Sequence, residues 1–443
     1  MIELPSNGHT LFRRTRAHSN PYRVLLLLFI LLGFLFIYRE WDNGVIVSPL
    51  DPTPTPTRTL DSYALEAATH FQAGNLNKAI SAYQFAASLQ PNDAHLWADL
   101  ARVQVYSSRL LTNDTQRQQR LEEALASADK AVEANPEDSY AHAVRALVLD
   151  WYGQPVYVGD RSARLMAEAE AEATRALQLD NTNALALAYY AEILADQQKL
   201  TQAEQYIRQA IERNPNLMDV HRVNAYVQES LTNYNGAIQE YERAIELTPN
   251  LTFLYIDLGV NLRHLKQYDR ALESFTKAVN INKQLGVLDP IPYLAIGKTY
   301  SQTGDFFAAS LNVRKALEIE PATPDVYGQL GIVYFKSRNY EGAILALQCA
   351  VRGCDPEVSC EVRRCDPQTD PAITIQGMPL NSNTVVYYYT YGSALAGMHR
   401  ESNGYCAEAV KVLREVRNGF SNDPIILQII APSEEICAGF GYK

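Results

Sequence analysis

A sequence pattern that recurs every 34 residues constrains this chain more than any other feature. In five of the units a helical run ends at a proline, and two alanines precede that proline by twelve and five residues. Clear examples are Ala203 and Ala210 before Pro215, and Ala237 and Ala244 before Pro249. Alanines seven residues apart lie on one stripe of a helix, where small side chains let a second helix pack closely. The pattern therefore predicts stacked pairs of antiparallel helices.

Earlier in each unit a large, an apolar and a small residue recur at fixed spacing. Examples are Tyr255, Leu258 and Gly259, then Tyr293, Ile296 and Gly297, then Tyr327, Leu330 and Gly331. Together with the two alanines and the proline, this pattern resembles the tetratricopeptide repeat. The resemblance implies an all-α, right-handed superhelical solenoid of helix-turn-helix repeats, in which each unit mainly contacts its neighbours.

About eight repeats are predicted over residues 60–353. The regular units are 60–93, 184–217, 218–251, 252–285, 290–323 and 324–353. Two longer units, 94–138 and 139–183, each carry about eleven extra residues near the turn between their helices. An irregular cysteine-containing insertion is expected at 354–384, and a ninth repeat-like hairpin with a C-terminal cap at 385–443.

A charge-free apolar run, VLLLLFILLGFLFIY, precedes the repeats at residues 24–38. Its length gives only ~22 Å of helix, but Tyr22, Arg23, Arg39 and Trp41 flank it and suit the membrane interface. A buried core helix would have a polar face, and a cleaved signal peptide would have a small-x-small site after the run. We therefore expect a transmembrane signal anchor at 22–38.

Charges on the two sides of the run predict its orientation. Four arginines precede the apolar run: Arg13, Arg14, Arg16 and Arg23. Arg39 follows the run and is itself followed by acidic residues. The positive-inside rule then gives a short cytoplasmic N-terminus at 1–21 and an extracytoplasmic repeat domain. A cytoplasmic repeat domain is the alternative. Alternating Pro and Thr make 39–59 a semi-rigid linker.

All six cysteines lie near the C-terminus: Cys349, Cys354, Cys360, Cys365, Cys406 and Cys437. An even number in an exported chain predicts disulfides, with fifteen possible pairings. Zinc binding is disfavoured because C-x2-C pairs and interleaved histidines are missing, and free thiols are the remaining alternative. The segment 354–384 is expected to cap the open end of the solenoid, with a recognition loop as the alternative.

Catalytic, cofactor and metal motifs are not found in the sequence. Gly297-Lys298-Thr299 matches the end of a phosphate-binding loop, but Pro292 stands where that loop requires a glycine. Formal net charge is −11, with positive charge concentrated only at the N-terminus, which disfavours nucleic-acid binding. We expect a protein without enzymatic activity.

The resemblance implies that the first helix of each unit lines a concave groove. Polar or aromatic candidates at its ligand-facing positions are Asp219, Arg222, Tyr226, Glu229, Arg263, His264, Lys298 and Tyr389. Such side chains could bind a peptide through charged hydrogen bonds and ring contacts, but a solvated groove without a ligand is an equal alternative. Trp151, Tyr152 and Tyr157 form a second candidate surface. The carboxylate-binding pattern of chaperone-binding relatives is missing, with Ala64 and Ala68 in its place.

These features together predict a membrane-anchored scaffold. Its concave face would bind a protein or peptide partner in the assembly of an envelope complex. The alternative is an accessory protein for polysaccharide export or cell-wall synthesis. The 27 tyrosines suit that alternative because aromatic rings stack on sugars, although most of them stand at packing positions.

Overall fold

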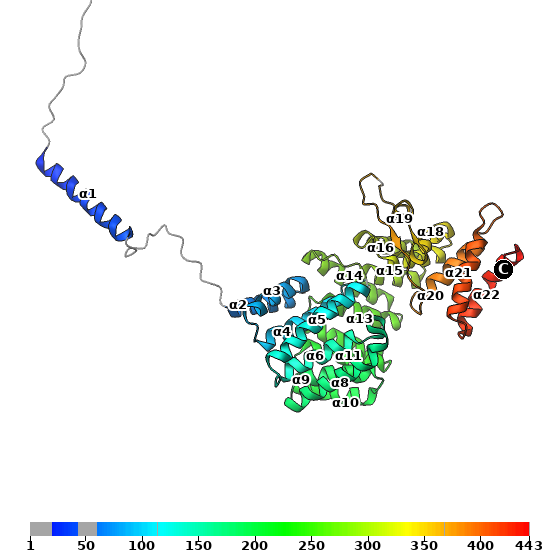
Figure 1. The fold of residues 1–443 in the computed structure, drawn as a ribbon, viewed down its shortest axis with the longest axis horizontal. Coiled ribbons are helices and arrows are strands. Elements are labelled where there is room, and N and C mark those ends of the chain that lie inside the picture. Colours follow the sequence, from blue (N-terminus) through cyan, green and yellow to red (C-terminus); the bar gives the residue numbers. More distant parts are fainter. Residues whose placement is uncertain (1–19, 43–59, 113, 367, 443) are drawn as a thin grey trace, which may run out of the picture. The chain divides into compact units, whose positions relative to one another are not determined.

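The computed structural model describes residues 20–42, 60–112, 114–366 and 368–442 (Figure 1). The chain divides into two units, Met1–Arg58 and Thr59–Lys443, which are described separately. Most of the predicted cytoplasmic N-terminus and of the Pro/Thr-rich linker lies outside the described residues, and so do Arg13, Arg14 and Arg16.

The first unit contains helix α1 (Pro21–Asp42). Its large apolar side chains from Val24 to Tyr38 are 47–70% exposed among the described residues. Residues Pro21–Glu40 have a mean hydropathy of 2.2 and are long and apolar enough to cross a membrane. This finding is compatible with a membrane anchor or a signal sequence.

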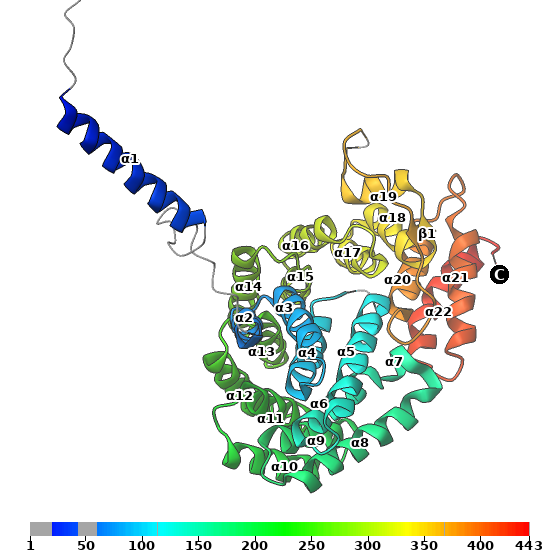
Figure 2. The ribbon, with the colours of Figure 1, turned by 60° about the vertical axis from the view of Figure 1, so that its left-hand side comes forward.

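The second unit is a solenoid of antiparallel helix pairs, which confirms the predicted all-α repeat fold (Figures 1 and 2). The first pairs are α2 (Leu60–Gln72) and α3 (Leu76–Leu89), α4 (Ala94–Ser108) and α5 (Asp114–Ala134), α6 (Ser139–Tyr152) and α8 (Ser162–Leu179), and α9 (Ala184–Asp196) and α10 (Leu200–Arg213). Next come α11 (Met218–Ser230) and α12 (Tyr234–Leu247), α13 (Thr252–His264) and α14 (Tyr268–Leu285), α15 (Ile291–Thr303) and α16 (Phe306–Ile319), α17 (Pro324–Lys336) and α18 (Tyr340–Val351), and α20 (Val385–Gly397) and α21 (Tyr405–Gly419). Helix α22 (Pro424–Gly439) follows the last pair.

Capping residues and small residues explain why the repeats fold in this way. Asp93, Asp138 and Asn183 accept hydrogen bonds from backbone N–H groups at the starts of α4, α6 and α9, a contribution of about 1 kcal/mol for each cap. Small residues are required where paired helices touch. A Cβ atom on Gly259 would lie only 2.4 Å from the ring of Phe275.

The two longer units accommodate their extra residues differently. In unit 94–138 they extend the second helix, α5, to 21 residues, compared with 14 in α10. In unit 139–183 they form the short helix α7 (Pro155–Val158) and the 3-10 turn η1 (Gly159–Arg161), between α6 and α8. A long insertion is thus absorbed either by helix extension or by the turn.

The solenoid curves far enough for its first repeat to touch a later one. The side-chain amide of Asn250 donates to the carbonyl oxygen of Gln72 at 3.2 Å, across 178 residues of sequence. Gly74, with φ of +78°, lies at this contact, where a Cβ atom would come within 2.1 Å of the carbonyl oxygen of Asn250. Glycine is therefore needed at position 74 both for its backbone conformation and for this close approach.

The six cysteines form three disulfides, as the sequence predicted: Cys349–Cys354, Cys360–Cys365 and Cys406–Cys437. The first two close short loops around α19 (Pro356–Arg363), beside the two-residue strands β1 (Gly353–Cys354) and β2 (Ile375–Gln376). The third joins α21 to α22 across 31 residues. The end of the solenoid is therefore covalently tied together.

Removal of the third disulfide should destabilise the chain most. The Cys406→Ser/Cys437→Ser variant should lose about 3–4 kcal/mol of unfolding free energy, compared with about 2 kcal/mol for Cys349→Ser/Cys354→Ser, because stabilisation grows with the length of the closed loop. Denaturant unfolding of both variants measures the difference. Non-reducing peptide mapping should recover the three pairs, and any other pairing would contradict the structure.

Candidate functional site

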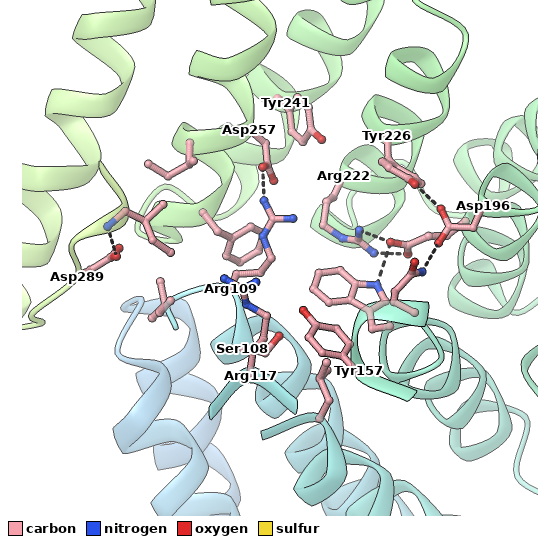
Figure 3. A pocket seen from close by; sticks show the side chains of 18 residues that line it. Ser108, Arg109, Arg117, Tyr157, Asp196, Arg222, Tyr226, Tyr241, Asp257 and Asp289 are labelled. Carbon is pink, nitrogen blue, oxygen red and sulfur yellow. Dashed lines mark hydrogen bonds and ion pairs between the residues drawn. The ribbon is translucent and has the colours of Figure 1, made fainter. Parts of the chain in front are cut away.

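A cavity of about 400 Å³ lies between the first helices of successive repeats (Figure 3). Its lining residues come from α4, α6, α9, α11, α13 and α15, together with residues of α5, α7, α12 and three connecting segments. Figure 3 shows Arg109 and Arg222 extending into its centre. The volume is within the ~300–1,000 Å³ usual for ligand pockets.

Asp219, a predicted groove residue, lies in the buried contact between repeats beside this cavity. It is 1% exposed, and Arg102 on α4 donates two hydrogen bonds to its carboxylate, at 3.0 and 2.7 Å. The hydroxyls of Tyr106 and Tyr189 also donate to it, the latter at 2.7 Å. Burial alone would raise the pKa of Asp219, but Arg102 and the two hydroxyls hold it well below its usual range. Asp219 is thus satisfied within the chain and is not available at the surface.

Arg222, the second predicted residue, is buried and lines the cavity. It donates two hydrogen bonds to Glu192, at 2.8 and 2.6 Å, and Trp151 donates to the same carboxylate at 3.1 Å. Within the part of the chain that the structure describes, the Arg222 Nε atom has no hydrogen-bond partner. A ligand atom in the cavity could accept from it.

A second wall of the site is acidic. Tyr226, also predicted, donates its hydroxyl to Asp196, and Gln154 donates to the same carboxylate at 3.0 Å. Behind them Asp150 is fully buried, and neither of its carboxyl oxygens has a partner among the described residues. Burial, together with Asp196 and Glu192, raises the pKa of Asp150 well above its usual range.

The wall facing these residues is built around Arg109 and Asp289. Arg109 pairs with Asp257 on α13, 148 residues away in sequence. Asp289 accepts from the backbone N–H of Ile291 and from the side-chain amide of Asn282, both at 2.9 Å. Burial raises the pKa of Asp289 to about 6. The cavity is therefore lined by both charge signs, and its three arginines, Arg109, Arg117 and Arg222, are each paired with a carboxylate.

Three further predicted groove residues lie along the neighbouring helices. Glu229 accepts from Asn261 at 3.0 Å, and the ring of His264 stacks on Tyr234 with centroids 4.8 Å apart. Arg263 donates to the carbonyl of Ala295 at 3.5 Å. Arg263 and His264 lie in the last turn of α13, outside the lining of the cavity.

Lys298 and Tyr389 complete the predicted set. Lys298 is exposed on α15, and partial burial and the nearby Arg263 lower its pKa. Tyr389 is half-buried on α20 and packs against the C-terminal core, away from the cavity. The structure thus places Arg222 and Tyr226 in the cavity wall and Asp219 beside it.

The second predicted surface is part of the same cavity. Trp151 and Tyr157 line it, whereas Tyr152 donates to Glu122 at 3.0 Å. Sequence reasoning missed Arg102, Tyr106, Asp150, Tyr189 and Glu192. All five lie on the first helices of their repeats, and this position was the sequence signal that could have identified them. Only the curvature of the solenoid brings them together.

Loss of the Asp219 carboxylate should strongly destabilise the solenoid. Asp219→Leu should cost about 3–5 kcal/mol of unfolding free energy, because it removes the buried carboxylate to which Arg102, Tyr106 and Tyr189 donate and leaves Arg102 with only Asp99, 4.0 Å away, as an acidic partner among the described residues. The double variant Asp219→Leu/Arg102→Met should recover part of this loss, since both charges are then removed. Urea unfolding of both variants, with the exposed Glu273→Ala as control, measures these effects. Equal stability of Asp219→Leu and the control would contradict this role.

The raised pKa of Asp289 has an effect on stability that depends on pH. A carboxyl with a raised folded pKa binds its proton more tightly in the folded state, so its contribution is favourable below pH ~4 and is lost as pH rises through about 6. Asp289→Asn should therefore gain stability relative to wild type as pH increases, by up to about 3 kcal/mol at pH 8. Thermal midpoints of both proteins between pH 4 and 8 test this. A pH-independent difference would contradict it.

Comparisons with known proteins follow the same repeats. A family model described as tetratricopeptide repeat matches residues 186–217, 225–251, 254–285 and 292–323. No curated protein matches the sequence. Solved structures that resemble this one include YrrB, a TPR protein with an unusual peptide-binding site, with 20% identity and a TM-score of 0.33 over 48% of this chain and 97% of that chain.

Two other solved structures show a similar degree of likeness. A tetratricopeptide repeat protein from Parabacteroides merdae ATCC 43184 has 16% identity and a TM-score of 0.37, over 62% of this chain and 98% of that one. A thermophilic TPR protein of Thermus thermophilus has 16% identity and a TM-score of 0.38, over 46% of this chain and 99% of that one. With four matched units, and helix pairs of the same form before and after them, this chain contains a solenoid of tetratricopeptide repeats.

Proposed function

We propose that this chain is a non-enzymatic, membrane-anchored scaffold that binds a protein or peptide partner on its concave face. Tetratricopeptide repeats generally mediate protein–protein interactions, and four units match that family. The observation that carries the proposal is the cavity between the first helices, with Arg222 and Tyr226 in its wall. The outcome of binding would be assembly of an envelope complex.

The lining of the cavity suggests which part of a partner it would hold. The guanidinium groups of Arg109 and Arg222 already pair with Asp257 and Glu192. The partner therefore does not need to supply a charged group to neutralise these arginines. Trp151 and Tyr157 offer apolar ring surface, and the Arg222 Nε atom offers a free donor. A side chain with an apolar body and an acceptor at its tip, such as tyrosine or glutamine, would fit this lining.

Two features support an extracytoplasmic location of the repeats. Helix α1 is uniformly apolar and exposed, as expected for an anchor. The three disulfides favour an oxidising compartment, because cytosolic proteins seldom keep such bonds. Together with the N-terminal arginines of the sequence, they favour a cytoplasmic N-terminus and repeats on the other side.

A polysaccharide ligand is the second candidate. It is favoured by the same cavity, in which Trp151, Tyr157 and Tyr226 stand beside carboxylates and arginines that could bind hydroxyl groups. An accessory role in polysaccharide export or cell-wall synthesis would then follow. Direct binding of purified cell-wall polysaccharide to the full chain distinguishes this candidate from a protein partner.

Crosslinking in intact cells, followed by detergent extraction, tag pull-down and mass spectrometry, tests the scaffold. One recurrent protein should be recovered, and Tyr157→Ala and Lys298→Glu should each reduce its recovery at least about tenfold, equivalent to about 1.4 kcal/mol. Lys78→Glu is the matched control, because Lys78 is an exposed lysine on α3, a second helix of its repeat. Absence of a recurrent protein, or equal loss in the control, would contradict the proposal.

A further inference from the structure

The last helix, α22, carries an apolar stripe on its solvent-exposed side. Ile425, Ile429 and Ile436 are 68%, 40% and 44% exposed, and Phe440, directly after the helix, is 51% exposed. Pro432 is also exposed and stands between them. Spacings of three and four residues place all five on one face. This apolar face, called the α22 stripe below, differs from the polar outer face that a terminal cap requires.

The other side of α22 is fully used. Ile426, Ile430 and Cys437 are buried, and the helix packs against α20 and α21 (Figure 2). The disulfide Cys406–Cys437 fixes the helix to α21. The α22 stripe is therefore presented by a firmly held helix, and its exposure does not result from a loose end of the chain.

The α22 stripe continues a contact surface that the solenoid uses elsewhere. Helix α17 begins Pro324-Asp325 and α22 begins Pro424-Ile425, so Ile425 corresponds to Asp325. The Asp325 carboxylate accepts a hydrogen bond at 2.8 Å from Tyr387 on α20, the next first helix. This edge of a first helix is thus where another helix packs. In α22 the same edge is apolar and exposed.

We propose that the α22 stripe binds the α22 stripe of a second copy of this chain, with the two helices antiparallel. Four of the five residues of the stripe are symmetric in sequence about the point between residues 432 and 433, whereas Pro432 lies next to that point. Ile429 and Ile436 are equally distant from that point, and so are Ile425 and Phe440. A two-fold axis there places Ile425 of each copy against Phe440 of the other, and Ile429 against Ile436. Such a contact is self-complementary, as a two-fold interface requires.

Charge does not oppose this pairing. Within the α22 stripe there is no charged residue. Beside it, Glu434 is already paired with Arg417 on α21, with one hydrogen bond at 3.0 Å. Only Glu435 adds an unpaired acidic group from the same turn of the helix, where its side chain is exposed to solvent.

The area of the contact also favours a second copy over a freely diffusing partner. One helical face from each copy buries less than the ~1,200 Å² at which stable complexes begin. Two copies held in one membrane meet at a much higher effective concentration, which makes such a small contact sufficient. This last step rests on the proposed anchor α1, whereas the self-complementary contact does not.

Counting the copies per complex of the fluorescently labelled full chain in lipid vesicles, over a range of protein-to-lipid ratios, tests the proposal under the membrane confinement that it assumes. Wild type should show a monomer–dimer equilibrium, and Ile429→Glu/Ile436→Glu should weaken it at least about tenfold. The matched control is Phe307→Glu/Leu311→Glu on α16, where the two side chains are 80% and 46% exposed. The control should dimerise like wild type. A wild-type chain that stays monomeric at every protein-to-lipid ratio, or a control that also loses the dimer, would overturn the proposal.

A photocrosslink identifies the contact in cells. With p-benzoylphenylalanine at position 440 and two differently tagged copies expressed together, crosslinks should join the two tags and map to the first turn of α22, around Ile425. Crosslinks that map to another helix would contradict the antiparallel arrangement. The recovery of a concave-face partner is measured separately, so failure of either experiment does not decide the other.

Discussion

The buried contact between Arg102 and Asp219 is the interaction on which the arrangement of the repeats most depends. It joins helices 117 residues apart in sequence, and two tyrosine hydroxyls complete the coordination of the carboxylate. A solenoid whose units touched only their neighbours could flex along its length. Here three contacts between distant repeats fix the curvature of the solenoid. They are Arg102 with Asp219, Arg109 with Asp257, and Asn250 with Gln72. The cavity between the first helices is a consequence of that fixed curvature.

This closure explains why the site contains so many charges. Side chains on the concave face of one repeat lie against those of a repeat several units away, so buried carboxylates need partners. Glu192 has Arg222, and Asp257 has Arg109. Asp150 has none among the described residues, and burial with the nearby Asp196 and Glu192 raises its pKa well above its usual range. Ion pairs on the concave face therefore stabilise the fold. Other groups on the same face, such as the Arg222 Nε atom, remain for binding a ligand.

The sequence predicted the fold well because the repeat is a local pattern. Paired alanines and Gly259 stand where helices of one hairpin touch, and this contact depends only on residues close in sequence. Asp219 was predicted as a ligand-facing groove residue, whereas its carboxylate is buried against Arg102. That pairing depends on the summed rotation of several repeats, which no local pattern encodes. The disulfides show the same limit. Six cysteines at one end predicted the bonds, whereas the choice among fifteen pairings required the positions of α18 to α22.

The two ends of the solenoid are stabilised by different contacts. The N-terminal repeat lies against the turn at Asn250, so the curve of the chain itself covers part of that repeat. Near the C-terminal end, two disulfides and an ion pair between Arg417 and Glu434 hold the helices together. Ile425 and Phe440 stay exposed on this firmly held helix, as the proposed apolar contact requires. A two-fold contact there would leave both concave faces free, so that one assembly could present two copies of the same site.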